Sequence, residues 1–349
     1  MKTITKEQWK IYWKQFIQYL VKTTNGMAYG LFATLIIGTI ISSLGRFFPV
    51  GSFMATHIAT LSQILKYATG VGIGMGIALS LKLDGLKMIT ASVAGAITTY
   101  SATPIGMKIG DPLAIYVVVI LTILCLNAIL RKKTPIDIIL IPLVGVVISF
   151  VISSIITDPI FLITKGVGNM IQTATTYQPI LMGIVIAVLM GMALTAPISS
   201  AAIAMMLPIG GIAFGASVVG CSAQMIGFAI MGRKDNSFGV CVSVGIGTSM
   251  LQFKNIIRKP LIWLPTIIVS AVLGPIATTV LQTQCSNVGA GMGTSGLVGP
   301  LETLATMNYT TNAWLSVIVL MVIAPALLVW VIDLFFRKKN WIVAGDLKI

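Results

Sequence analysis

Two short stretches carry residue types that suit the binding of a small polar ligand, and they share one spacing. Residues 245–251 read GIGTSML and residues 291–297 read GMGTSGL, so both fit the pattern G-x-G-T-S-x-L. Hydroxyl groups donate and accept hydrogen bonds, and glycine lets the backbone turn tightly and approach a ligand closely. The pattern therefore predicts a substrate-binding site at both stretches, formed by Thr248, Ser249, Gly291, Gly293, Thr294 and Ser295.

The repetition has a second interpretation, because a protein rich in Gly and Ser can repeat such a pattern by coincidence. Two amide side chains, Gln252 and Asn255, follow the first stretch. They suit a neutral polar ligand such as a polyol, and they equally suit hydrogen bonds between helices. We include both among the predicted substrate-binding residues.

Glu302 is the acid that lies closest to the second stretch, six residues after Gly296. It is the predicted catalytic acid or base, with a solvated loop carboxylate as the alternative. The sequence presents no Ser-His-Asp arrangement and no cluster of metal ligands. GMGTSG also lacks the preceding strand that a dinucleotide-binding loop requires. We therefore expect no metal and no cofactor.

The composition places this site in a membrane. Of 349 residues, 56% are hydrophobic and 9% are charged, whereas a soluble domain carries about 25% charged residues. The net charge of +14 does not indicate nucleic acid, because the basic residues form short clusters between apolar runs, as cytoplasmic loops do. We expect a multi-pass protein with the lipid bilayer as its main partner.

The apolar runs predict an all-α bundle of about ten transmembrane helices. Residues 1–25 are separate: their aromatic residues recur at helical spacing opposite a row of lysines, which is typical of an amphipathic helix on a membrane surface. The alternative is a helix packed on the protein's own cytoplasmic face. The predicted spans lie near 27–45, 67–82, 85–103, 113–130, 136–157, 180–195, 199–215, 216–232, 261–281 and 313–336.

Basic residues distinguish the two sides of the membrane. With both ends of the chain in the cytoplasm, the outer loops hold only Arg46, Lys66, Lys108 and Lys165 of the 23 Lys and Arg residues. Cytoplasmic loops carry an excess of Lys and Arg. The distribution therefore predicts an even number of crossings and a cytoplasmic location for both ends.

The uncharged stretch 285–300 lies between two long apolar runs. Inside a bilayer, backbone that is not helical is tolerated only where protein buries it or where it lines a cavity. The stretch is therefore either a re-entrant hairpin or an external loop. Since paired broken segments in transporters often meet at one site in mid-membrane, we predict two re-entrant hairpins around one cavity.

Three segments resemble a known family: LTAPISSAAIA (194–204), IGTSMLQFKNIIRKP (246–260) and GAGMGTSGLVGP (289–300). They are similar to EIIC-like membrane proteins of the phosphotransferase system, in particular to the branch that includes the perfringolysin O regulator. The resemblance implies a sugar-permease-type fold in a bacterial cell membrane, usually a homodimer, with a substrate site between two re-entrant hairpins. Residues 26–349 would then form one EIIC-like transport domain.

One departure from the family affects the expected activity. Sugar-phosphorylating EIIC proteins of the glucose superfamily carry a glutamate in this hairpin, and Gly296 occupies the comparable position here. No EIIB-like domain is recognised in the chain, so sugar phosphorylation would need a separate EIIB-type partner. The leading hypothesis is a transporter of a small polar solute. A sensor or regulator that keeps the fold without transport, and an anion carrier without phosphotransfer, stay open.

Overall fold

The computed structural model describes residues 6–45, 47–49, 51–101, 111–130, 134–175, 178–196, 198, 200–206 and 210–349. All regular elements within these residues are helices, which confirms the predicted all-α class. Among the described residues, six helical segments are long and apolar enough to cross a membrane, and three more apolar helices are shorter. The number of about ten crossings stays a prediction. The six long segments are Ile11–Ser42, Pro112–Ile129, Asp137–Ile163, Ile212–Gly232, Pro260–Thr279 and Thr311–Lys338.

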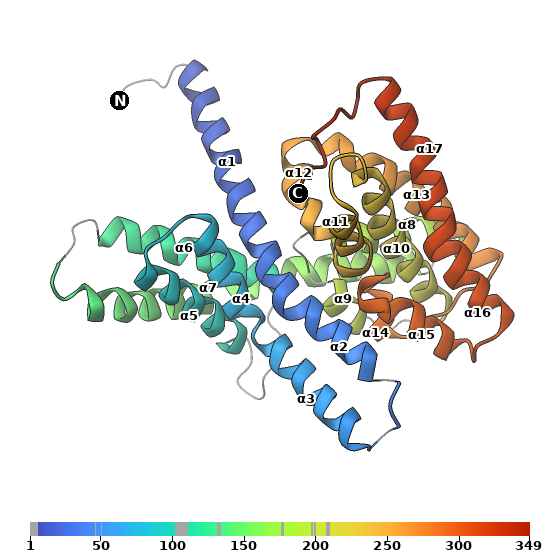
Figure 1. The fold of residues 1–349 in the computed structure, drawn as a ribbon, viewed down its shortest axis with the longest axis horizontal. Coiled ribbons are helices and arrows are strands. Elements are labelled where there is room, and N and C mark those ends of the chain that lie inside the picture. The colour runs from blue at the N-terminus through green and yellow to red at the C-terminus, as the bar shows by residue number, and fades with distance from the viewer. Residues whose placement is uncertain are drawn as a thin grey trace.

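One long helix opens the chain. Helix α1 (Lys6–Leu31) continues through the π-helical segment η1 (Phe32–Ile36) into α2 (Ile37–Gly45). It runs without interruption through the predicted boundary between residues 25 and 26. The first turns of α1 extend beyond the rest of the molecule (Figure 1). Its apolar side chains Ile11, Tyr12, Trp13 and Phe16 are at least half exposed, so this face does not pack on the protein itself.

A first group of helices packs beside α1. After α3 (Phe53–Tyr67) and α4 (Thr69–Ser80) come α5 (Gly85–Ser101), α6 (Pro112–Ile129) and α7 (Asp137–Ala174). Helices α1, α4, α5 and α6 share one apolar core that includes Ile73, Ile77, Ala91 and Ile115. Helix α6 matches the predicted span near 113–130, and it begins at Pro112 because the side chain of Asp111 caps it.

Helix α7 is longer than predicted. The span expected near 136–157 ends before Asp158 and Pro159, whereas α7 has 38 residues and contains both Pro142 and Pro159 in its interior. Proline removes one backbone hydrogen bond from a helix, but helices in membranes tolerate this where neighbouring groups satisfy the backbone. Beyond Pro159, the buried residue Ile171 packs into the core of the second half.

The second half of the chain forms a separate core around α10, most of whose residues are buried. The elements in chain order are α8 (Pro179–Thr195), α9 (Ser200–Met206), α10 (Ile212–Gly232), α11 (Phe238–Val242), η2 (Ser243–Gly247), η3 (Ser249–Gln252), α12 (Phe253–Arg258), η4 (Pro260–Trp263), α13 (Leu264–Thr279), α14 (Asn287–Ala290), η5 (Ser295–Leu297), α15 (Val298–Thr306), α16 (Thr311–Leu315), η6 (Ser316–Ile323) and α17 (Ala324–Lys338).

The predicted boundary between the spans 199–215 and 216–232 lies inside a helix. The structure has the short α9, with seven residues, and the long α10, with 21 residues. Gly211 is the N-cap of α10 and adopts a φ of +57°, a conformation that glycine adopts readily. The break in the apolar run therefore falls before residue 212 rather than at 215.

The long helix α1–α2 passes between the two halves (Figure 1). Helices α4–α6 lie on one side of it and α8–α17 lie on the other. The start of α1 and the α12 region lie toward the top of this view, and the α2–α3 turn lies at the bottom. The chain thus forms two helical bodies with one shared helix between them.

Close backbone contacts join the helices of the first body. A Cβ atom on Gly70 of α4 would lie 2.2 Å from the carbonyl oxygen of Gly95 in α5. Small residues allow helix backbones in membranes to approach in this way. The glycines of α4 therefore serve helix packing, against α5 at Gly70 and against α1 at Gly76.

We predict that Gly70→Ala destabilises the protein by about 1–3 kcal/mol, because the added methyl group overpacks the α4–α5 contact. Gly85→Ala is the control: a Cβ there meets no atom within 4 Å, so a change within about 0.5 kcal/mol is expected. Thermal unfolding of both variants in detergent provides the measurement. Equal stability of the two variants would contradict the packing role of Gly70.

Candidate functional site

The first G-x-G-T-S-x-L motif interrupts a helix. Thr248 has extended backbone angles (φ −161°, ψ 137°) between η2 and η3. Its hydroxyl accepts a hydrogen bond from the backbone N–H of Met250 at 3.2 Å, and so caps the returning segment. Residues 238–258 consist of two helical arms on either side of this break. The entering arm is formed by α11 and η2 (residues 238–247), and the return arm is formed by η3 and α12 (residues 249–258). We call residues 238–258 the first broken helix.

The second motif also interrupts a helical segment. It joins α14 to α15, and Gly293, Gly296 and Leu297 in it have positive φ angles. At Gly293 (φ +52°), a Cβ atom would also lie 2.7 Å from the backbone of Cys221 in α10. Only glycine satisfies both conditions without strain. Residues 287–306 form the second broken helix, and both motifs break helices as the sequence predicted.

The two breaks are in direct contact. The hydroxyl of Thr294 donates to the carbonyl oxygen of Gly245 at 2.5 Å. The hydroxyl of Ser295 donates to the carbonyl oxygen of Gly247 at 2.8 Å. The side chains of Thr294 and Ser295 are buried, as are those of Thr248 and Ser249. The motifs therefore meet at one place, 46 residues apart in the sequence, and each second-motif hydroxyl satisfies a backbone carbonyl of the first motif.

The long helix α1–α2 contacts both breaks. The ring of Phe32, at the start of the π-helical segment, lies against Gly247, and the backbone of Ile40 lies against Gly296. Turns of π-helix occur frequently at functional sites. Sequence analysis did not single out Phe32 or Ile40, because an apolar residue in an apolar helix carries no local signal of such a contact.

A buried polar network supports the first break from behind. Ser249 shares a hydrogen bond of 2.8 Å with the hydroxyl of Thr195 at the end of α8. The side-chain oxygen of Gln224 in α10 accepts from the indole N–H of Trp263 at 2.9 Å and from the hydroxyl of Thr266 at 2.8 Å. It also accepts a longer bond from Thr195. Thr195 lies in the segment 194–204 that carries the resemblance.

Gln252 and Asn255, both predicted substrate-binding residues, contact the end of the chain. Gln252 donates to the carbonyl oxygen of Leu347 at 2.9 Å, and Asn255 donates to that of Lys348 at 3.1 Å. Asn255 also donates to the side-chain oxygen of Gln252 at 2.6 Å. Both amides are buried. The return arm of the first broken helix makes these contacts, through residues that follow the break at Thr248 in the chain.

Glu302 lies in α15 and contacts the start of the second broken helix. Its carboxylate accepts a hydrogen bond of 2.8 Å from the hydroxyl of Ser286, the N-cap residue of α14. Gly291, in the break itself, has its carbonyl oxygen bonded by the hydroxyl of Ser200 in α9 at 2.7 Å. The Glu302 carboxylate therefore connects α15 to the start of α14, the two arms of the second broken helix, at the end away from the break.

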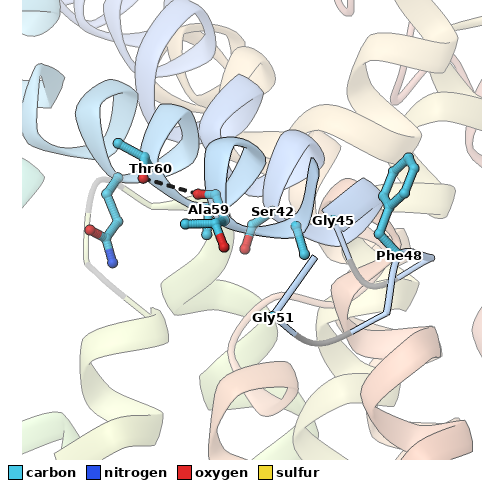
Figure 2. A pocket seen from close by; sticks show the side chains of 9 residues that line it. Ser42, Gly45, Phe48, Gly51, Ala59 and Thr60 are labelled. Atoms are coloured by element: carbon cyan, nitrogen blue, oxygen red, sulfur yellow. Dashed lines mark hydrogen bonds between the residues drawn. The ribbon is translucent and has the colours of Figure 1, made fainter. Parts of the chain in front are cut away.

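Two cavities lie next to the long helix. One, of about 610 Å³, lies between α2 and α3 and is lined by residues that include Ser42, Phe48 and Thr60 (Figure 2). Thr60 donates to the carbonyl oxygen of Thr56 on its wall at 3.0 Å. The other, of about 520 Å³, lies between α1 and the end of α4. Neither cavity is lined by a residue of the two motifs, whose hydroxyls bond protein atoms instead.

Within the part of the chain that the structure describes, the long apolar helices indicate a multi-pass membrane protein. A family model described as "Phosphotransferase system, EIIC" matches residues 21–349. The chain therefore belongs to the phosphotransferase-system EIIC family, as the resemblance in the sequence implied. The comparisons found no curated protein and no solved structure that matches the chain.

We predict that Gln224→Leu lowers the stability of the protein by about 1–3 kcal/mol, because it leaves the buried indole N–H of Trp263 without its acceptor. Gln63→Leu is the matched control, since Gln63 is exposed on the wall of the α2–α3 cavity. A change within about 0.5 kcal/mol is expected there. Chemical unfolding followed by tryptophan fluorescence compares the two. A neutral Gln224→Leu would show that the network is dispensable.

Proposed function

We propose that this EIIC-family protein carries a small polar solute across the membrane and binds it where the two broken helices meet. The contact between the motifs is the observation that supports this proposal most strongly: two hydroxyls of one break bond two carbonyl oxygens of the other. These four groups are uncharged donors and acceptors, and they match the hydroxyl groups of a sugar or polyol.

The contact describes a closed arrangement of the proposed site. When the breaks separate, Thr294 and Ser295 lose their carbonyl partners, and the carbonyl oxygens of Gly245 and Gly247 lose their donors. A buried polar group without a partner is costly. A solute with adjacent hydroxyls would satisfy both sets of groups at once, so its binding would compensate for the separation.

The arrangement of the two bodies supports alternating access. Each body has its own apolar core, and the long helix α1–α2 lies between them while contacting both breaks. In transporters of this kind, one bundle moves against the other around a fixed site. The proposal includes two re-entrant hairpins at the breaks, about ten crossings, both chain ends in the cytoplasm, a bacterial cell membrane and a homodimer.

Phosphorylation of the solute would need two further components. A base must remove the proton from the attacked hydroxyl, and a separate EIIB-type partner must supply the phosphoryl group. Glu302 is our candidate for the base. Its contact with Ser286 places it at the base of the second broken helix, so a catalytic role requires that contact to open. Glu302→Gln would then abolish phosphorylation and leave solute binding intact.

We predict that Thr294→Val weakens solute binding by about five- to tenfold, because it keeps the side-chain shape and removes one hydroxyl whose hydrogen bond is worth about 1–1.5 kcal/mol. Thr279→Val is the matched control: Thr279 is exposed, and its hydroxyl bonds only its own helix. A thermal-shift titration in detergent, with neutral sugars, sugar phosphates and small anions, gives both affinities.

Each outcome of this titration separates the alternatives. Stabilisation by a neutral sugar, lost in Thr294→Val, supports the permease, and uptake of that sugar into proteoliposomes then tests transport. Binding without uptake would indicate a sensor or regulator. Stabilisation by anions alone would indicate an anion carrier. Equal affinities of the wild-type protein and Thr294→Val would remove the second break from the site.

A further inference from the structure

The last seven residues of the chain, Val343–Ile349, lie against the base of the first broken helix. We call them the tail strap. Asp235 and Asn236, which precede the entering arm, bind the main chain of the strap. Asp235 accepts from the backbone N–H groups of Gly345 at 2.9 Å and of Leu347 at 3.2 Å. Asn236 donates to the carbonyl oxygen of Leu347 and accepts from the N–H of Ile349, both at 2.8 Å.

The return arm holds the same strap from the other side. The amides of Gln252 and Asn255 donate to the carbonyl oxygens of Leu347 and Lys348. At the end of this arm, the ammonium group of Lys259 pairs with the carboxylate of Asp346 at 2.6 Å. The strap thus bridges the return arm and the turn that leads from α10 into the entering arm. Most of these bonds involve its main chain.

Two apolar side chains, Leu347 and the partly buried Ile349, anchor the strap in the apolar core. Leu347 is fully buried (0% exposed) and belongs to the core of the second body. Val343, at the other end of the strap, is 43% exposed. The strap is held by two apolar side chains, one ion pair and a series of main-chain hydrogen bonds. All of these contacts are non-covalent, so the strap can detach without breaking a covalent bond.

We propose that the tail strap is a latch on the first broken helix. While it is bound, it holds the two arms together at their base, so the break at Thr248 stays in contact with the second motif. Release of the strap lets the arms part and the break move. This assigns Gln252 and Asn255 to the latch rather than to the solute. The use of this movement in transport rests on the proposed function.

Hydrogen–deuterium exchange of the purified full-length protein in detergent, without any solute, tests the latch. We expect Leu347→Asp to release the strap and to accelerate exchange of the amides of residues 243–258 by about tenfold or more, because truncation or charging of a buried leucine costs more than the free energy of a tenfold change. Exchange in α10 and α13 should stay as in the wild-type protein. Val343→Asp, the matched control on the same strap, should leave all these rates unchanged.

Two results would overturn the proposal. Unchanged exchange in residues 243–258 would show that the strap does not hold the broken helix. Equal acceleration in α10 and α13 would show that Leu347 is a general core residue rather than part of a latch. Where Leu347→Asp does not fold, Leu347→Ala is measured by the same criteria. Because the experiment needs no solute, its result does not depend on whether the protein transports one.

Discussion

The structure depends on one constraint: two stretches of backbone that are not helical lie buried among helices, and their polar groups need partners. Inside a bilayer, unpaired backbone groups cost several kcal/mol each. The chain meets this requirement by pairing the breaks with one another, through Thr294 to Gly245 and Ser295 to Gly247. Serines on neighbouring helices satisfy further carbonyl oxygens, as Ser217 does for Ala290. Each break therefore depends on the other for its conformation.

The mutual dependence of the two breaks constrains the helices and side chains that surround them. The breaks approach neighbouring backbones so closely that side chains would not fit, as at Gly293 beside α10. Their polar surroundings come from α8, α10 and α13, through Thr195, Gln224 and Thr266. The tail strap holds the opposite end of the first broken helix. One broken helix is thus fixed at its tip by polar contacts with the other and at its base by the strap. A movement at either end changes the constraints on the whole segment.

Sequence patterns predicted the features that local chemistry determines. Repeated G-x-G-T-S-x-L spacing indicated both breaks, and the apolar run near 113–130 indicated α6. Features that depend on distant contacts were not predictable in this way. The continuation of α7 through Pro159 depends on packing against the second body, and the partners of Gln252 and Asn255 lie more than 90 residues away. An amide side chain carries the same local signal whether it binds a solute or a distant main chain, so the sequence alone does not distinguish these two roles for Gln252 and Asn255.

The most direct test of the account measures whether the two breaks are together at rest and separate when a solute binds. Ile246 and Leu297 are partly exposed within the two motifs, so nitroxide labels on Ile246→Cys and Leu297→Cys would report their separation. Strong dipolar broadening of the electron paramagnetic resonance spectrum is expected without solute, and weaker broadening with the sugar that stabilises the protein most. Absence of broadening at rest, or broadening that a stabilising sugar leaves unchanged, would contradict a shared site at the breaks.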